Sequence, residues 1–487
     1  DYMKICIVGG GSAGWMTATT LSNLLDCENI TLIESPNTPT SGVGESTHRR
    51  FTAWLELLDI KGEEFLKETG GSIKHSIKFT NFLKKDSGSF HYPFGDPHFE
   101  SSLAWMCIEE GMFTHNDYAK HINPLAVVAD MGKVDWSADL SFHLDAVKFA
   151  QYLRKNHCED VDYISADVVG FEESEKGIES LTLDDGSTVT ADLFVDCTGF
   201  SSLLLGQYLK EPFVPYDNIL PNDTAWATQV PYTDKEKELV AYTECTAIEN
   251  GWVWNIPLWD KIGTGYVYSS KHVSDEDAKQ ELIKQLESRG YDISECEFKK
   301  LPMKIGRYER SFVKNVVAIG LSAGFIEPLE SNGLFTVHEN LIDLWKTLRR
   351  GVPSQYMKNA YNAGTSYNFD EFAEFVAIHY VFTQRDDTQY WRDLMNKDYD
   401  IVGDKNYDKY GMLAYTREMY QHNEFRHPDK GFHYIASGMN VSAYTAPKNN
   451  LNQMPICEMK RREWEDWIGE YLPTVHESLR KDIHGSL

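Results

Sequence analysis

The sequence lacks an excess of positive charge, and this limits its partners. Lys and Arg total 47 and Asp and Glu total 74, which gives a formal net charge of −27 at pH 7. Proteins that bind nucleic acid concentrate positive charge on one surface, whereas this chain would repel a phosphate backbone. The same negative field disfavours a peripheral role on anionic membranes. We therefore expect no nucleic-acid partner and no membrane partner.

Long apolar runs and paired cysteines are also missing. No apolar run reaches the roughly 18 residues that a membrane-spanning helix needs, and no signal peptide is visible. The eight cysteines are scattered without a Cys-x-x-Cys pair. In an acidic protein of intracellular type this pattern favours reduced, structural thiols over disulfides. We expect a cytoplasmic protein with no bound metal, and either a monomer or a homo-oligomer.

The first 34 residues predict a dinucleotide-binding β-α-β unit. A short apolar strand at 4–8 runs into Gly9–Gly14, a helical stretch follows to about residue 25, and a second strand at 30–33 ends on Glu34. The glycines let the backbone approach a pyrophosphate, while the helix N-terminus offers N–H donors and the positive end of its dipole. Glu34 lies 20 residues after Gly14, where an acid accepts hydrogen bonds from a ribose diol. The predicted binding residues are Gly9, Gly11, Ser12, Ala13, Gly14 and Glu34.

Apolar strands that return late in the chain predict a sheet assembled from distant segments. Residues 191–199 and 315–320 each form an apolar strand that runs into a small turn. The predicted fold class is α/β, with a Rossmann-like domain, an inserted β-sheet region on the substrate side and a helical C-terminal part. The predicted domain boundaries are 1–100, 140–215 and 300–350 for the dinucleotide-binding domain, 100–140 and 215–300 for the β-rich region, and 350–487 for the helical region.

The segment Gly251–Leu258, which reads GWVWNIPL, is the most distinctive part of the chain. The Glu249-Asn250-Gly251 turn before it is typical of a hairpin, and Pro257 is expected to end the strand. Residues two apart on a strand share a face, so Trp252 and Trp254 should stand side by side as an apolar wall. Taken alone, this pattern is more often ordinary sheet packing. A wall gains a function only if it faces a reactive group.

These motifs together resemble the flavin-dependent halogenases of the tryptophan-halogenase type. That family is built on the aromatic-hydroxylase flavoprotein fold, so the resemblance implies that the dinucleotide is FAD. Four segments are similar to the family's shared motifs: Gly9–Gly14 to its glycine turn, Trp252–Pro257 to W-x-W-x-I-P, Phe325–Gly333 to F-x-x-P-L-E-S-T-G, and His379 through Trp391 to a further shared stretch. The likeness covers residues 4 to about 392.

The resemblance implies a reaction in two places. Reduced FAD (FADH2) and O₂ would convert a halide ion to hypohalous acid, which would reach an aromatic substrate held apart from the flavin. The tryptophan wall would keep that substrate from the flavin, where it would be hydroxylated instead. Lys74 aligns with the family's catalytic lysine, which would hydrogen-bond hypohalous acid or carry the halogen as a haloamine. The alternative for Lys74 is an exposed strand lysine, as we expect for Lys78 on the same face.

Glu330 is the second catalytic residue that the resemblance implies. It would stabilise the cationic ring intermediate, orient Lys74 or accept the departing proton, and it could also satisfy a helix dipole. Ser331 corresponds to a position linking the flavin and substrate sites, and Asn332 and Gly333 to the halide site, where backbone N–H groups form an anion nest. The remaining residues assigned by resemblance to the FAD site are Gly44, Glu45 and Ser46 of a strap over the flavin (Gly42–Thr47), together with Gly320 and Leu329.

Three departures from the family pattern bear on selectivity. Asn332 replaces the family's threonine at the halide site, which predicts better use of bromide or iodide than of chloride. Tyr92 stands where the family has a substrate-site histidine, while Phe94 matches an aromatic residue that holds the indole. The C-terminal residues that bind the amino-acid end of tryptophan have no clear counterpart, and 431–439 with Tyr444 form either a lid or a surface loop. We therefore expect an indole- or phenol-like substrate rather than free tryptophan.

The source of reduced flavin is predicted to be another protein. The chain carries one complete dinucleotide fingerprint and no second one for NAD(P)H, so a separate flavin reductase is the expected partner. Two other functions stay open at this point. One is a flavin monooxygenase that hydroxylates an aromatic substrate, and the other is an FAD-binding protein without catalytic activity. Only a halogenase needs Lys74, Glu330 and the tryptophan wall together.

Overall fold

The computed structural model describes residues 3–25, 29–38, 44–95, 97–98, 101–397, 399–401, 405–406, 431–441 and 454–485. The chain divides into two compact units, each made of three separated stretches. The first unit comprises Asp1–Gly70, Leu144–Tyr216 and Met303–Asp370, and the second comprises Gly71–His143, Asp217–Pro302 and Glu371–Leu487. The finer domain boundaries given above stay a sequence-based prediction.

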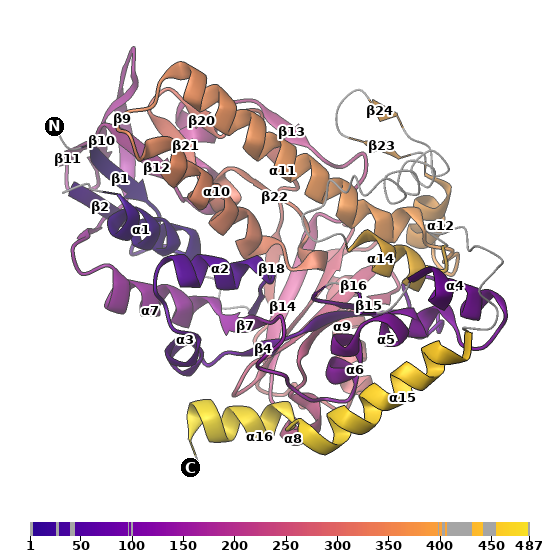
Figure 1. The fold of residues 1–487 in the computed structure, drawn as a ribbon. Helices are drawn as coiled ribbons and strands as arrows, with labels where there is room; N and C mark the ends of the chain where they lie inside the picture. The colour runs from indigo at the N-terminus through magenta and orange to yellow at the C-terminus, as the bar shows by residue number, and fades with distance from the viewer. Residues whose placement is uncertain are drawn as a thin grey trace. The chain divides into compact units, whose positions relative to one another are not determined.

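A six-stranded sheet forms the centre of the first unit (Figure 1). Its strand order is β20-β21-β12-β1-β2-β8, and every neighbouring pair is parallel except β20 with β21. The strands are β1 (Lys4–Val8), β2 (Asn29–Glu34), β8 (Asp162–Ser165), β12 (Leu193–Asp196), β20 (Phe312–Val313) and β21 (Val316–Ala318). The predicted return of late strands to the first β-α-β unit is thereby confirmed.

Helices and two small antiparallel sheets complete this unit. The helices are α1 (Ser12–Leu24), α2 (Arg50–Leu57), α3 (Gly62–Thr69), α7 (Ala146–His157) and α10 (Gly333–Leu348). The small sheets are β9 (Val168–Ser174) with β10 (Gly177–Leu183) and β11 (Thr188–Thr190), and β13 (Phe213–Pro215) with β19 (Gly306–Tyr308) and β22 (Gly324–Phe325). A short strand, β3 (Gly44–Ser46), precedes α2. Helix α1 packs on β1 and β2 and lies between α7 and α10, which buries Trp15, Met16 and Leu21.

A seven-stranded sheet forms the centre of the second unit. Its order is β18-β14-β17-β16-β15-β5-β6, and its neighbouring strands are antiparallel except for the parallel pair β15 and β5. The strands are β5 (Ser76–Thr80), β6 (Ser89–Pro93), β14 (Thr224–Val230), β15 (Tyr242–Ile248), β16 (Gly251–Pro257), β17 (Ile262–Tyr268) and β18 (Lys299–Pro302). Strands β16 and β17 are buried along their whole length.

The two faces of β16 have different neighbours because side chains alternate along a strand. Val253 packs in a cluster with Leu282 and Leu286 of helix α9 (Asp275–Ser288). Ser274 caps this helix, since its hydroxyl oxygen accepts a hydrogen bond from the backbone N–H of Asp277. Trp252 and Trp254 are therefore on the face of the sheet opposite to Val253.

The second unit also contains further strands and helices. They are β4 (Ser72–Lys74), β23 (Asp400–Ile401), β24 (Lys405–Asn406), α4 (Ser101–Glu109), α5 (Tyr118–Ile122), α6 (Pro124–Asp130), α8 (Lys235–Glu238), α12 (Gln389–Asn396), α14 (Phe432–Gly438), α15 (Met454–Tyr471) and α16 (Val475–Ser478). Strand β7 (Ser141–Asp145) and helix α11 (Gln355–Val381) each contribute residues to both units. Among the described helices, none combines the length and apolar character needed to cross a bilayer.

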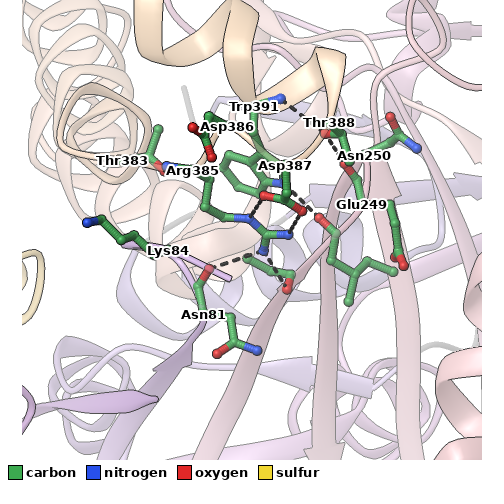
Figure 2. Close-up of polar contacts among 12 residues, drawn as sticks. Asn81, Lys84, Glu249, Asn250, Thr383, Arg385, Asp386, Asp387, Thr388 and Trp391 are labelled. Carbon is green, nitrogen blue, oxygen red and sulfur yellow. Dashed lines mark hydrogen bonds and ion pairs between the residues drawn. The ribbon is translucent and has the colours of Figure 1, made fainter. Parts of the chain in front are cut away.

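A buried arginine holds the turn that leads into the tryptophan strand (Figure 2). The Arg385 guanidinium pairs with both oxygens of Asp387, at 2.9 and 2.7 Å, and donates to the carbonyls of Asn81 and Ala247. It also lies 4.6 Å from the ring centre of Trp391. The indole N–H of Trp391 donates to the carbonyl of Ile248 at 2.7 Å. These contacts fix the end of β15, three residues before β16 begins.

We expect Arg385→Ala to lower the free energy of unfolding by about 3 kcal/mol, because it leaves Asp387 and two carbonyls without their cationic partner. Chemical denaturation of the purified protein measures this change. Arg392→Ala is the matched control, since Arg392 is exposed in the same segment and should change stability by less than about 0.5 kcal/mol. Equal losses in the two variants would contradict the expectation.

Candidate active site

The turn between β1 and α1 leaves room for a ligand at its centre and none at its edges. A Cβ at Gly14 would lie 1.8 Å from the carbonyl oxygen of Gly9, so the helix starts in direct contact with the turn. A Cβ at Gly11 would meet no described atom within 4 Å. Gly11 precedes α1 and no described side chain caps this helix. The first N–H groups of α1 are therefore available to an anion such as a pyrophosphate.

Glu34 lies against the same turn. A Cβ at Gly10 would lie 2.2 Å from the carboxyl carbon of Glu34, so glycine is needed for this approach. The carboxylate accepts a hydrogen bond from the Tyr163 hydroxyl at 2.9 Å and lies 3.8 Å from Arg154. These positions fit the ribose and pyrophosphate of a bound FAD. Ser12, at the helix start, donates to the carbonyl of Ala146 at 3.3 Å.

The late strands bring a second group of residues to this turn. Gly320 has a φ of +73°, and a Cβ there would lie 2.9 Å from the Cβ of Ala13. Leu329 and Glu330 follow in the short turn Pro328–Glu330, where both are buried. The structure thus places Gly320 against the start of α1, and helix α10, which begins at Gly333, also packs on α1.

The described part of the strap lies against that segment. The Ser331 hydroxyl donates to the hydroxyl of Ser46 at 2.9 Å, and Glu45 places a carboxylate oxygen 3.3 Å from where a Cβ of Gly333 would stand. Burial raises the pKa of the Glu45 carboxyl to about 7. Gly42 and Val43 of the predicted strap lie outside the described residues.

Asn332 stands at the N-cap position of α10 without capping it. Its side-chain N–H donates to the carbonyl of Ile326 at 3.0 Å, so the amide turns back toward the preceding turn. The Asn332 side chain therefore makes no capping hydrogen bond to α10. Gly333 begins this helix, and its N–H group lies at the positive end of the helix dipole, where an anion is favoured.

Lys74 is completely buried in the second unit, at the end of the three-residue strand β4. Its ammonium nitrogen lies 5.2 Å from the ring centre of Phe94. The chain then bends at His75, whose N–H donates to the carbonyl of Ala241 and whose carbonyl accepts from the N–H of Phe94. This bend explains why Lys74 and Phe94 meet.

Lys78 lies beyond the bend, on β5, and pairs with Asp130 at 3.7 Å. It remains partly exposed, as expected. The prediction that Lys74 and Lys78 share one strand face is wrong, because β4 pairs with β7 whereas β5 belongs to the seven-stranded sheet.

Tyr92 and Phe94 are buried among aromatic rings contributed by the helical C-terminal region. A Cβ at Gly431 would lie 2.0 Å from the hydroxyl oxygen of Tyr92, and the Tyr92 ring is 5.8 Å from that of Tyr434. Asn123 donates to both the carbonyl of Phe94 and the hydroxyl of Tyr434, each at 3.0 Å. Residues 432–438 thus form helix α14, which packs on β6 rather than lying as a surface loop. Tyr444 lies outside the described residues.

The two indoles of β16 stand side by side, as predicted. The ring centres of Trp252 and Trp254 are 6.2 Å apart, and the rings are 0% and 8% exposed. Gly265 faces Trp254 across the sheet, and a Cβ there would lie 2.1 Å from the indole ring. A glycine on the neighbouring strand therefore makes the space that the second indole occupies.

Comparison with known proteins finds relatives that match nearly the whole chain. The model of the family described as tryptophan halogenase matches residues 4–447. The chain is 31% identical to tryptophan 7-halogenase RebH of Lentzea aerocolonigenes over 99% of both chains. The apo structure of VirX1 superposes with a TM-score of 0.91 at 33% identity, covering 100% of both chains. BrvH, a flavin-dependent halogenase from Brevundimonas sp. BAL3, gives a TM-score of 0.84 at 26% identity over 98% of this chain and 99% of that one.

The chain belongs to the tryptophan-halogenase family. The predicted class, a flavin-dependent halogenase with a mixed α/β fold, is thereby confirmed. The roles of individual residues, the halide and the substrate stay predictions. The FAD, strap and halide residues fall within the first unit, as does Glu330, whereas Lys74, Tyr92, Phe94 and the two tryptophans fall within the second.

Sequence reasoning missed the residues that surround Lys74. Ser72 and His143 contact each other on the pair β4 and β7, and Tyr434 lies beside Tyr92. The only sequence signal for His143 is a histidine in the alternating strand SFHLD, which does not distinguish a core residue from a site residue. Pairing partners of short strands such as β4 are not readable from one sequence.

We expect Gly11→Ala to weaken FAD binding by about tenfold or more, or about 1.4 kcal/mol, while leaving thermal stability unchanged. The added methyl group meets no described protein atom but would stand where a pyrophosphate approaches the turn. Titration of the apoprotein with FAD, followed by flavin fluorescence, measures the affinity. Gly14→Ala is the contrasting variant, since its methyl group would collide with Gly9 and reduce stability itself. Unchanged FAD affinity in Gly11→Ala would contradict the assigned site.

Proposed function

We propose that this protein uses reduced FAD, O₂ and a halide ion to halogenate an electron-rich aromatic substrate through Lys74. The observation that carries this proposal is a fully buried lysine beside an aromatic ring, Phe94. Burying an ammonium group costs free energy, so a chain without a use for it would place a neutral residue there. Reduced FAD, O₂, halide and a proton give FAD, water and hypohalous acid; the acid then halogenates the ring with release of a second water.

The FAD would be held by the glycine turn, Glu34 and the described strap residues. Gly9, Gly11 and Gly14 bring the backbone N–H groups of α1 toward the pyrophosphate, and Glu34 accepts from the ribose diol. Gly44, Glu45 and Ser46 would close over the flavin, supported from below by Gly320 and Leu329. When bound, FAD supplies the oxidation of halide. The protein's contribution is to bind, orient and separate the reactants.

Lys74 would hold the electrophilic halogen next to the substrate ring. It donates a hydrogen bond to hypohalous acid or carries the halogen as a haloamine, and both roles require the enclosed setting of its ammonium group. Glu330 would stabilise the positive charge that develops on the ring, or accept the proton that leaves. Ser331 donates a hydrogen bond to Ser46 of the strap, and this contact would connect the binding of flavin beneath the strap with the segment that carries Glu330.

The substrate is proposed to be a compact aromatic molecule such as an indole or a phenol. Phe94, Tyr92 and Tyr434 offer ring faces and edges, with which an aromatic substrate stacks favourably. The Tyr92 hydroxyl reaches Gly431, so α14 closes this side of the site against β6. Trp252 and Trp254 would bar the substrate from the flavin, so that hypohalous acid alone passes. A separate flavin reductase would supply FADH2.

The halide site is proposed at Asn332 and Gly333. The start of α10 at Gly333 would offer a backbone N–H group to an anion, and the Asn332 amide turns back to the carbonyl of Ile326 instead of capping the helix. Replacement of the family's threonine by asparagine changes the size and polarity of this site. We therefore propose better use of bromide or iodide than of chloride.

Lys74→Ala should lower the rate of product formation by about 100-fold or more, because it removes the group that places the halogen at the ring. Oxidation of FADH2 should continue. Mass spectrometry of an indole incubated with bromide, a flavin reductase, NADH and FAD measures the product. Lys78→Ala is the matched control and should retain activity, since Lys78 lies on another sheet and pairs with Asp130. Product formation that survives in Lys74→Ala would overturn the lysine mechanism, and a hydroxylated product would favour a monooxygenase.

Competition between halides tests the assignment of Asn332. With chloride, bromide and iodide at equal concentrations, the wild-type protein should give mainly brominated or iodinated product, and Asn332→Thr should raise the chlorinated fraction. Mass spectrometry separates the products. A wild-type preference for chloride would contradict the proposal for this site, while leaving the lysine mechanism untouched.

A further inference from the structure

We propose that His143 is a positioning residue for Lys74, which fixes the lysine strand against the end of the tryptophan strand. The inference rests on the function proposed for Lys74 and adds a residue that neither the sequence motifs nor the family resemblance single out. His143 is completely buried, lies on β7 and pairs with Ser72 of β4. Since residues two apart on a strand share a face, Ser72, Lys74 and His143 lie on the same side of this strand pair.

The hydrogen bonds of His143 determine which ring nitrogen carries the proton. The Ser72 hydroxyl has one proton and donates it to the carbonyl of Pro257, which can only accept. Ser72 must therefore accept from Nδ1–H of His143, which lies 3.2 Å away. Nε2 of the neutral ring is then an acceptor, and the hydroxyl of Thr243 donates to it at 2.8 Å. The chain of donors runs from Thr243 through His143 and Ser72 to Pro257.

This chain of hydrogen bonds joins strand β4 to two strands, β15 and β16, that are already paired with each other in the seven-stranded sheet. Thr243 belongs to β15, Pro257 is the last residue of β16, and Ser72 lies two residues before Lys74 on β4. Strand β4 is only three residues long, and its own ladder to β7 provides little restraint. The hydrogen bonds from Thr243 through His143 and Ser72 to Pro257 therefore set the position of the Lys74 ammonium group relative to the strand that carries Trp252 and Trp254.

The charge state of the imidazole supports the same role. Burial and the charge of Lys74 together hold the pKa of His143 well below its usual range, while the Pro257 carbonyl opposes this shift. His143 is thus neutral near pH 7, as the donor chain requires, and adds no second positive charge beside Lys74. If position 143 served only to fill space, an apolar residue would suffice, and neither the hydrogen-bond partners nor a single tautomer of the ring would be needed.

His75, the residue that follows Lys74, is held by hydrogen bonds at both ring nitrogens as well. Its Nδ1–H donates to the carbonyl of Asp139 at 3.0 Å, and its Nε2 accepts from the N–H of Asp135 at 3.1 Å. Burial lowers the pKa of this ring as well, against the effect of Asp139 and Asp135. Lys74 is therefore followed in the chain by one neutral histidine, His75, while the second, His143, lies opposite Ser72 on the paired strand.

The test compares halogen transfer with halogen production in the complete protein supplied with FAD, a flavin reductase, NADH and bromide. His143→Phe fills the ring volume without hydrogen bonds, and we expect about a tenfold or greater fall in brominated indole per FADH2 oxidised. Hypohalous acid trapped by a diffusible diketone scavenger should rise in proportion, because oxidation of halide continues while its delivery fails. His143→Asn retains a donor near the position of Nδ1 and should restore part of the yield. Ser72→Ala should reproduce the defect of His143→Phe.

His272→Gln is the matched control. His272 also bridges a serine hydroxyl, that of Ser269, and a second oxygen, that of Asp393, but lies apart from β4. It should retain the wild-type ratio of product to trapped acid.

A folded His143→Phe variant with the wild-type ratio of brominated indole to trapped acid would overturn the proposal. The proposal would also fail if a loss of FAD affinity and a lower melting temperature accounted for the entire defect. If Lys74→Ala keeps its product, the proposed function fails; if Lys74→Ala loses product and His143→Phe does not, only this inference fails.

Discussion

The cost of burying one ammonium group shapes the second unit of this protein. Lys74 is completely buried on a strand of three residues and lies beside an aromatic ring. A buried charge is tolerated only where the surrounding groups are fixed and partnered. The bend at His75, its bonds to Ala241 and Phe94, and the donor chain through Ser72 to Pro257 all serve this requirement. Much of what looks like irregular structure around β4 is therefore the support that a buried lysine needs.

In the first unit the main constraint is the close packing of backbone segments around the glycine turn, not the burial of a charge. Its glycine turn is packed so tightly at Gly9, Gly10 and Gly14 that any side chain would collide, yet it is open at Gly11. Gly320 and Ser331 then bring the late segment to the turn by adopting left-handed backbone conformations. Flavin binding and halide binding are thus expected at the starts of two helices that pack on each other, α1 and α10, where the positive end of the helix dipole favours an anion.

Much of this arrangement could be read from the sequence because it depends on local pattern. Strand 4–8, the helix that follows the glycine turn and the adjacent indoles of β16 all follow from hydrophobic period and turn residues. The contacts around Lys74 could not be read in the same way. The break at His75 sends two consecutive strands to different sheets, and the pairing of Ser72 with His143 joins residues 71 positions apart. Such pairings depend on tertiary packing, which overrides strand period when the strand is short.

The contact between Tyr92 and Gly431 has a consequence for anyone who wishes to widen the substrate range. The tyrosine hydroxyl fills the place where a side chain at position 431 would begin. The two positions therefore share a single volume, although 338 positions separate them in the sequence (431 − 92 − 1). Mutating them one at a time would sample mostly collisions or cavities, whereas a paired library that exchanges bulk between them would keep the packing constant while moving polar and aromatic groups across the site.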